Sequence, residues 1–315
     1  MKSQLLIHPE ELTRAWIDRA AQNGITALGI HPKGGRRAPF YVAEMLRMLD
    51  DAEFRALIDY ARESGLEIEY ELHAASFLLP RALFSENPEL FRMDAQGERT
   101  ADLNFCATNK QAIEIFAANA AALAEKLYGN NENFYFWLDD CRDSACHCEN
   151  CRQYTPSEQQ LIAVNAMARA CREKNPAARF AYLAYGDSMP PPKKVKAEKG
   201  VFLEYAPMEK YKAQSEKLAE EEEKMLPFLL DFFGKNGAKV LEYWYDNSMF
   251  SGWVKPPKKF LPDASAIARD MTLYREKGFE YISSFACFLG EDYEKLYGEA
   301  DISHFADIIR EFSRE

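Results

Sequence analysis

Residues 134–140 read FYFWLDD, an apolar strand-like run that ends in two adjacent carboxylates. Similar short apolar runs recur on both sides of it along the 315-residue chain, and nearly every interval between them has a helical pattern. Strand–helix alternation implies parallel strands joined by crossover helices. Eight such units predict an α/β fold, a closed (β/α)8 TIM barrel forming a single domain over residues 1–315. The expected strands lie at residues 5–7, 26–31, 66–74, 134–140, 179–185, 201–206, 239–246 and 281–288.

Two irregular stretches follow the third and seventh expected strands, at residues 76–108 and 246–262. Active sites of such barrels lie at the C-terminal ends of the strands, so both loops are expected to border the site. Phe250 and Trp253 in the second loop are candidates for stacking on a sugar ring, or they anchor the loop itself. The alternative architecture is an open doubly wound sheet. It is disfavoured because no strand is followed by a glycine-rich phosphate loop.

The composition excludes several classes of partner. The net charge of −11 disfavours nucleic acid and anionic membrane surfaces, both of which require a basic face. No apolar run approaches the ~20 residues of a membrane helix, and the N-terminus does not have the pattern of a secretory signal. Seven cysteines, four of them crowded between residues 141 and 151, do not resemble a disulfide framework. We therefore expect a reduced, cytoplasmic protein.

Asp139 and Asp140 are the first candidates for catalysis. Adjacent carboxylates repel one another, and paired acids whose pKa values are pushed apart are the usual equipment for cleaving glycosidic bonds. The alternative interpretation is a helix N-cap followed by a solvated acid. The position of the pair at the end of the fourth expected strand favours catalysis.

Other polar and aromatic residues recur at the ends of the expected strands, where they would supply the walls and hydroxyl-binding groups of a sugar pocket. Each alone is more typical of a core or rim residue. Glu71 and Glu242 lie within strands and are expected to be either buried acids paired with Arg or Lys, or supporting partners of the residues that bind substrate. The candidate substrate-binding residues are His31, His73, Glu204, Tyr205, Tyr243, Tyr245, Asp246 and Trp253, with Asn247 beside them.

The cysteine cluster after the fourth strand predicts a structural zinc site. Thiolates at CxCxxC spacing can close around one tetrahedral ion, and a reducing compartment favours metal over disulfide. A catalytic zinc is less expected, because such sites use fewer thiolates and keep one position open. Free thiols or a single disulfide are the alternatives. The predicted ligands are Cys141, Cys146, Cys148 and Cys151.

The order of motifs from residue 5 to residue 288 resembles that of family 20 glycoside hydrolases, the β-hexosaminidase type. The motifs are LLIHP (5–9), a strand ending at His31, ELHAAS (71–76), LNFCATN (103–109) and WLDD (137–140). The chain is more similar still to a domain-of-unknown-function family of bacterial glycosidase-like barrels. Those proteins also carry CxCxxC after the fourth strand, as CHCENC (146–151) does here.

The family 20 resemblance implies substrate-assisted retention, in which the substrate's own 2-acetamido group attacks the anomeric carbon. By position, Asp139 would orient that group and Asp140 would protonate the leaving oxygen. Tyr243 or Tyr245 would donate to the acetamido oxygen. The second acid is Asp here where that family has Glu, although the O-GlcNAc-removing enzymes also use paired Asp. The candidates for the family's tryptophan cage are Trp244 and Trp253.

Other hypotheses stay open at this stage. Asp140 paired with Glu204 or Glu242 would suit a glycosidase acting on a uronide or neutral sugar, and carboxyl separation distinguishes retaining from inverting pairs. Because a fold does not fix a function, a non-catalytic carbohydrate-binding or zinc-dependent interaction barrel is also consistent. A metal-dependent hydrolase is less expected. Carbohydrate is the expected partner, and the sequence indicates no oligomeric state.

Overall fold

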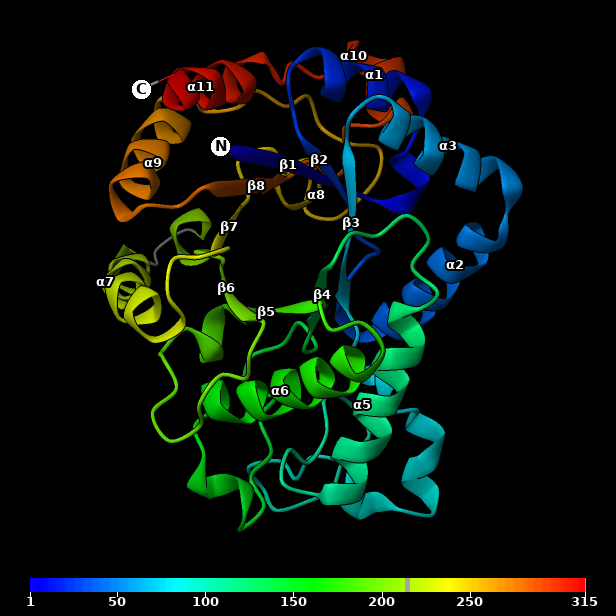
Figure 1. Ribbon diagram of the computed structural model, residues 1–315, viewed down its shortest axis with the longest axis vertical. Coiled ribbons are helices and arrows are strands. Elements are labelled where there is room, and N and C mark those ends of the chain that lie inside the picture. Colours follow the sequence, from blue (N-terminus) through cyan, green and yellow to red (C-terminus); the bar gives the residue numbers. More distant parts are fainter. Residues whose placement is uncertain (213–215, 315) are drawn as a thin grey trace.

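The computed structural model describes residues 1–212 and 216–314 of the chain. Its strands form a closed, all-parallel barrel in sequence order, in which β8 pairs with β1 (Figure 1). The predicted (β/α)8 barrel and all eight predicted strands are therefore confirmed. The strands are β1 (Lys2–Ile7), β2 (Ala27–Ile30), β3 (Glu67–His73), β4 (Asn133–Trp137), β5 (Arg179–Ala184), β6 (Val201–Tyr205), β7 (Lys239–Glu242) and β8 (Tyr281–Phe285).

Helices surround the strands as an outer layer, and α5 packs beside α6 (Figure 1). The longer helices are α1 (Arg14–Gln22), α2 (Ala38–Asp50), α3 (Ala52–Glu63), α5 (Lys110–Ala124), α6 (Pro156–Lys174), α7 (Glu216–Phe233), α9 (Ala264–Lys277), α10 (Glu291–Tyr297) and α11 (Ser303–Arg314). Two single turns, α4 (Ala75–Leu78) and α8 (Asn247–Phe250), follow β3 and β7. No helix in the described part of the chain has the length and apolar character needed to cross a membrane.

Local signals in the sequence explain where the helices begin and end. Thr155 caps α6 in a capping box with Glu158, and α9 ends at Gly278 in a left-handed conformation. The first helix does not begin directly after β1. Residues 9–11 form a 3-10 turn, and α1 begins only after Thr13, whose hydroxyl accepts a hydrogen bond from the Trp16 backbone N–H at 3.2 Å.

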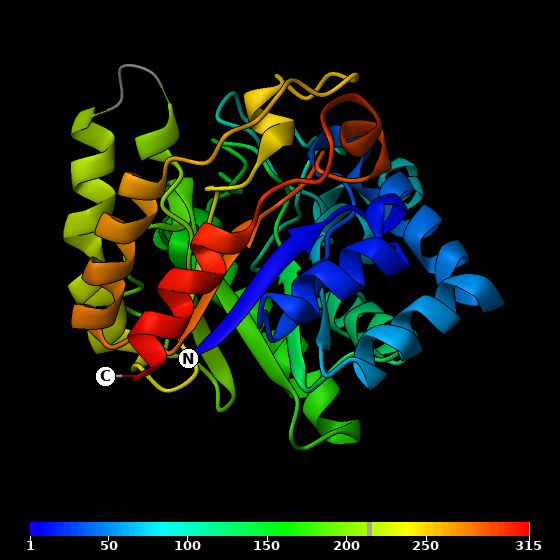
Figure 2. The ribbon, with the colours of Figure 1, turned by 90° about the horizontal axis from the view of Figure 1, so that it is seen from above.

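Several strands end earlier than predicted. β4 stops at Trp137, β7 at Glu242 and β8 at Phe285, so the residues that follow belong to loops. Figure 2 shows α8 and α10 at the end of the barrel toward which the β1 arrow points. Asp139 and Asp140 therefore lie in the loop after β4, at the face where barrel enzymes keep their active sites.

Alternation along the strands separates two apolar layers. On β4, Tyr135 and Trp137 point into the barrel, while Phe134 and Phe136 pack outward against the helices. The same alternation places Leu241 inside and Val240 outside on β7. Successive side chains of a strand point to opposite faces, so one register error would exchange the two layers.

Part of the barrel interior, around Lys239, is charged rather than apolar. Lys239 is fully buried, and its ammonium lies 2.5 Å from Glu71 and 3.1 Å from Glu204. Burial raises the pKa of both carboxyls, and the Lys239 charge opposes this rise. For Glu69, burial acts in the same direction, but the charges of Lys239 and Lys2, together with hydrogen bonds to the carboxylate, outweigh it and lower the pKa to about 2. One buried cation therefore compensates several carboxylates inside the barrel.

We predict that Lys239→Met lowers the free energy of unfolding by about 3–5 kcal/mol, because it leaves buried carboxylates without their cation. Urea denaturation at neutral pH measures this change. Lys174→Met is the matched control, since Lys174 pairs with Glu125 at the surface and exposed pairs contribute at most about 1 kcal/mol. Equal losses in the two variants would contradict the role given to Lys239.

Candidate functional site

A pocket of about 560 Å³ opens at the C-terminal ends of the strands. This volume lies within the usual range for small-molecule sites, roughly 300–1,000 Å³. Loops after nearly every strand contribute to it, as expected for a barrel active site. Its lining includes His8, His31, Lys33, Tyr41, His73, Trp137, Asp140, Tyr185, Tyr243, Asp246, Ser248, Trp253, Lys255, Phe285, Cys287 and Phe288.

Three histidines follow or end the first three strands and line one wall of the pocket. The Nδ1 atoms of His8, His31 and His73 each lie 2.8 Å from a backbone carbonyl oxygen, those of residues 31, 71 and 138. A carbonyl can only accept, so each Nδ1 carries the proton and Nε2 is the free acceptor of the neutral ring. Burial lowers the pKa of His8 to about 4 and that of His31 well below its usual value. His8 and His31 are therefore neutral at physiological pH.

The Nε2 atoms of these rings remain available to a ligand. Within the described part of the chain, none of the three Nε2 atoms makes a hydrogen bond. None of them is buried away from solvent without a partner either. Gly34 allows this arrangement beside His73, because a Cβ at that position would lie 2.8 Å from His73 Cδ2 and 3.3 Å from its Nε2. The wall thus presents acceptors of the kind that bind hydroxyl groups.

Aromatic rings form the floor of the pocket. The Trp137 ring lies 5.0 Å from that of His73, and Tyr243 stacks on Phe285 at 5.1 Å. The Trp137 indole N–H donates to Glu204 at 2.7 Å, so the charged residues of the barrel interior fix the position of this ring. Burial raises the pKa of Tyr243 well above its usual value, which keeps its hydroxyl protonated as a donor.

The two adjacent acids have different environments. The Asp139 carboxylate is buried and accepts hydrogen bonds from the backbone and hydroxyl of Ser76, at 3.2 and 2.5 Å, and from the backbone of Asn104 at 2.6 Å. Asp140 is exposed and lines the pocket, where its carboxylate accepts a hydrogen bond from the Tyr185 hydroxyl at 3.1 Å. The hydrogen bonds of the Asp139 carboxylate are thus made within the protein, whereas the Asp140 carboxylate is accessible to a ligand.

Five of the predicted binding residues line the same pocket as Asp140. They are His31, His73, Tyr243, Asp246 and Trp253. Asp246 also caps α8, accepting through one oxygen from the Ser248 backbone, the Ser248 hydroxyl and the Met249 backbone. Its second carboxylate oxygen has no hydrogen bond within the described residues and is not fully buried. Burial raises the pKa of Asp246.

The remaining predicted binding residues do not reach the pocket. Glu204 points into the charged interior beneath Trp137. Tyr205 and Tyr245 belong to the outer layer, where they pack against Tyr274 and Phe305. Glu242 also lies outside the barrel and takes hydrogen bonds from Lys210, Tyr211 and Tyr274. Alternate strand residues face opposite ways, and the sequence alone does not give the register that separates them.

His8 and Tyr185 also line the pocket, although neither was predicted from the sequence to do so. A usable signal was present, because His8 directly follows an expected strand and Tyr185 is the last residue of one, as His31 is. Tyr41, Lys33 and Lys255 carried no such signal, since they lie in connecting segments whose course depends on tertiary packing.

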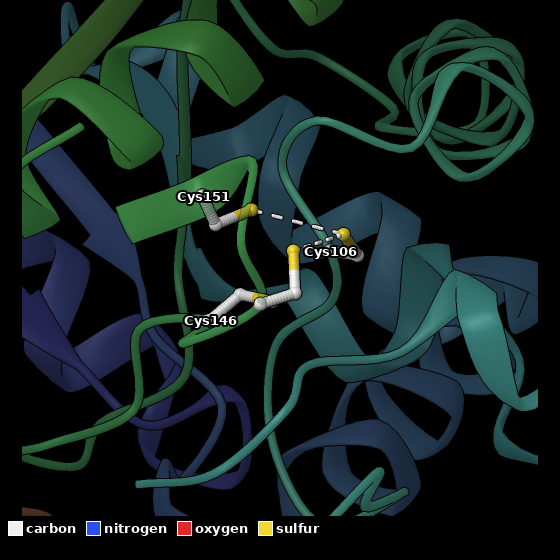
Figure 3. A group of neighbouring side chains, drawn as sticks. Cys106, Cys146 and Cys151 are labelled. Atoms are coloured by element: carbon white, nitrogen blue, oxygen red, sulfur yellow. Dashed lines mark hydrogen bonds between the residues drawn. The ribbon is translucent and has the colours of Figure 1, made fainter. Parts of the chain in front are cut away.

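Four cysteines gather beside the loop that carries the acids, and they differ from the predicted set in one member. Cys106, Cys146, Cys148 and Cys151 are buried, with sulfur atoms all within 4.8 Å of one another (Figure 3). Cys141, the fourth predicted ligand, is exposed and lies outside this group. Cys106 takes its place because the segment before α5 folds back onto the loop after β4, a contact that sequence spacing does not reveal.

The distances within this cluster suit one metal ion. The Cys106 sulfur lies 3.6 Å from that of Cys148 and 3.7 Å from that of Cys151. Zinc–sulfur bonds of about 2.3 Å in a tetrahedron place the sulfurs roughly 3.8 Å apart. Nearby donors support thiolates, since the Met93 backbone N–H lies 3.3 Å from Cys146 Sγ and the Thr108 hydroxyl lies 3.1 Å from Cys151 Sγ. The four cysteines can therefore hold a metal.

Known proteins share this fold. The pneumococcal exo-β-D-N-acetylglucosaminidase StrH, through a family 20 catalytic module, aligns with a TM-score of 0.51 and 13% identity over 99% of this chain and 84% of that chain. A family 5 glycoside hydrolase from Prevotella bryantii aligns with a TM-score of 0.55 and 10% identity, over 96% of this chain and 86% of that chain. A β-galactosidase from the Antarctic haloarchaeon Halorubrum lacusprofundi aligns with a TM-score of 0.57 and 12% identity, over 99% of this chain and 58% of that chain. At these identities the likeness establishes a shared barrel.

Sequence comparison identifies the family. No curated protein matches the chain. Residues 44–286, which are most of the chain, match the family described as "Domain of unknown function (DUF4838)". The expected resemblance, to a glycosidase-like barrel family distantly similar to family 20, is confirmed. The chain belongs to the DUF4838 family, on a barrel shared with glycoside hydrolases.

Proposed function

We propose that the protein is a glycoside hydrolase with Asp140 as the general acid. The observation that carries the proposal is the unequal environment of the acid pair. Asp139 is bound on both oxygens by the protein, whereas Asp140 borders a pocket with neutral histidines and aromatic rings. Such a combination of apolar surface with a few placed polar groups is typical of sugar sites. The barrel neighbours, which are glycosidases, agree with it.

We propose substrate-assisted retention as the mechanism. The acetamido oxygen of an N-acetylhexosaminide attacks the anomeric carbon, and Asp140 donates its proton to the leaving oxygen. The Tyr243 hydroxyl donates a hydrogen bond to the acetamido oxygen and orients it for this attack. Asp139 acts by fixing the loop rather than by binding the acetamido group, since its oxygens already accept three hydrogen bonds. This assignment differs from the orienting role that the family 20 resemblance implied.

A second mechanism uses two carboxylates. Of the described residues that line the pocket, only Asp140 and Asp246 are acids. Asp246 has one oxygen without a hydrogen bond, and burial raises its pKa, as expected for a group that delivers a proton. Asp246 would then be the acid and Asp140 the nucleophile or base, acting on a sugar that lacks an acetamido group. Glu204 and Glu242 are not suited to this role because they lie outside the pocket.

The aromatic residues of the loop after β7 suit the leaving-group side of the substrate. Trp253 lies at the pocket and is 67% exposed, and Phe250 on the same loop is 58% exposed. An exposed ring at the edge of a polar pocket offers a stacking surface for a further sugar unit. The proposed partner is therefore a glycan whose terminal residue enters the pocket.

We also propose that Cys106, Cys146, Cys148 and Cys151 hold one structural zinc ion. Four thiolates satisfy the coordination of zinc and leave no open position, so the ion would stabilise the loops rather than take part in hydrolysis. The pocket histidines are separate from this group.

The two mechanisms predict different results for Asp140→Asn and Asp246→Asn on a panel of nitrophenyl glycosides. Asp140→Asn should lower turnover at least ~100-fold in either case. Substrate-assisted chemistry predicts activity confined to acetamido sugars and nearly normal turnover by Asp246→Asn, because Asn also caps a helix well. Loss of activity in both variants, on sugars without the acetamido group, would favour the two-carboxylate mechanism. Normal turnover by Asp140→Asn would overturn both.

We predict that Gly34→Ala raises KM about 3- to 10-fold without lowering kcat comparably, because the added methyl displaces His73 and weakens one hydrogen bond to the substrate. Steady-state kinetics test this in a double-mutant cycle with His73→Ala. In the His73→Ala background the Gly34 substitution should have no further effect, since the ring it meets is gone. Additive losses would show that Gly34 acts through another contact.

A further inference from the structure

Two loops that are distant in sequence meet beside the acid pair. One is the long segment between β3 and α5, and the other joins β4 to α6. Asn104 connects them through its backbone N–H, which donates to Asp139 at 2.6 Å, and through its side chain, which accepts from the Asp139 backbone at 2.9 Å. The Asn104 amide also donates to the Ser144 hydroxyl at 2.9 Å. We call this reciprocal pair of residues the Asn104–Asp139 bridge.

The bridge lies next to the cysteine cluster in both loops. Cys106 is two residues beyond Asn104, and Cys146 is two residues beyond Ser144. Asn104 has a φ of 42°, a left-handed conformation that Asn tolerates but that local interactions must hold in place. The fold therefore secures Asn104 from one side by Asp139 and from the other by the segment that ends at Cys106.

Thiols alone provide little restraint between the two loops. Sulfhydryl groups are weak hydrogen-bond donors and acceptors, whereas four bonds to one ion would fix Cys106 to the cysteines of the other loop. Contacts at the edge of the cluster already favour thiolate ligands, because Arg99 and the Met93 backbone both donate toward Cys146. Gln159 of α6 holds the same loop through the backbone of Cys146 and Cys151.

We propose that a zinc ion held by Cys106, Cys146, Cys148 and Cys151 keeps the Asn104–Asp139 bridge closed and thereby positions Asp140 in the pocket. The part that concerns Asp140 rests on the proposed glycosidase function. The bridge itself is a property of the fold and can be observed without turnover. In this proposal Asp139 and Asn104 are positioning residues, and the ion acts on the reaction only through them.

Metal content and amide hydrogen exchange test the proposal together. We expect the wild-type protein, expressed with zinc, to contain one zinc per chain by mass spectrometry. Cys106→Ser should lose the ion, and exchange should rise at least ~10-fold in peptides covering residues 103–106 and 138–142. Cys141→Ser is the matched control. It should keep both the zinc and wild-type exchange, because Cys141 lies outside the cluster.

Chelation of the wild-type protein provides a second measurement if Cys106→Ser does not fold. Peptides from β1 and β8 serve as internal references, since neither strand pairs with β3 or β4, the strands that lead into the two loops. Faster exchange confined to the two loops would support the proposal. Loss of the ion with unchanged exchange at both loops would overturn it, as would loss of protection throughout the barrel, which would give the ion a global role. A zinc-free wild-type protein would also overturn it. None of these outcomes depends on finding a sugar substrate.

Discussion

The buried ammonium of Lys239 is the constraint on which the interior of this barrel depends. It neutralises carboxylates from β3 and β6 and lies 4.0 Å from the ring of Tyr135. Because Glu204 also accepts from the Trp137 indole, the charged layer fixes the floor of the pocket above it. The face that carries the pocket is therefore built on a fully buried ionic layer, where removal of one partner leaves the others uncompensated.

Burial controls the chemistry of the pocket wall in the same way. Each histidine donates a hydrogen bond from Nδ1 to a backbone carbonyl oxygen. Desolvation suppresses the charged form of His8 and His31. His8 and His31 consequently stay uncharged throughout the neutral pH range. This behaviour differs from that of an exposed histidine, which titrates close to physiological pH.

The barrel could be predicted from the sequence because strand–helix alternation is a local pattern. Strand ends were less predictable, and this changed the assignment of side chains. Tyr243 reaches the pocket from the turn beyond β7, whereas Tyr245, two residues later, packs outward against Phe305. Cys106 was missed as a member of the cluster for a different reason. Its partners are 40 or more residues away, and only the folded loops bring them together.

The order of the cysteines along the chain has a consequence for biosynthesis. Cys106 emerges from the ribosome before β4, whereas Cys146, Cys148 and Cys151 follow that strand within six residues of one another. The later three can gather as soon as they are made, but the fourth sulfur joins them only when the segments after β3 and β4 have come together. The four-sulfur cluster is therefore complete only after the segments that follow β3 and β4 have packed against one another.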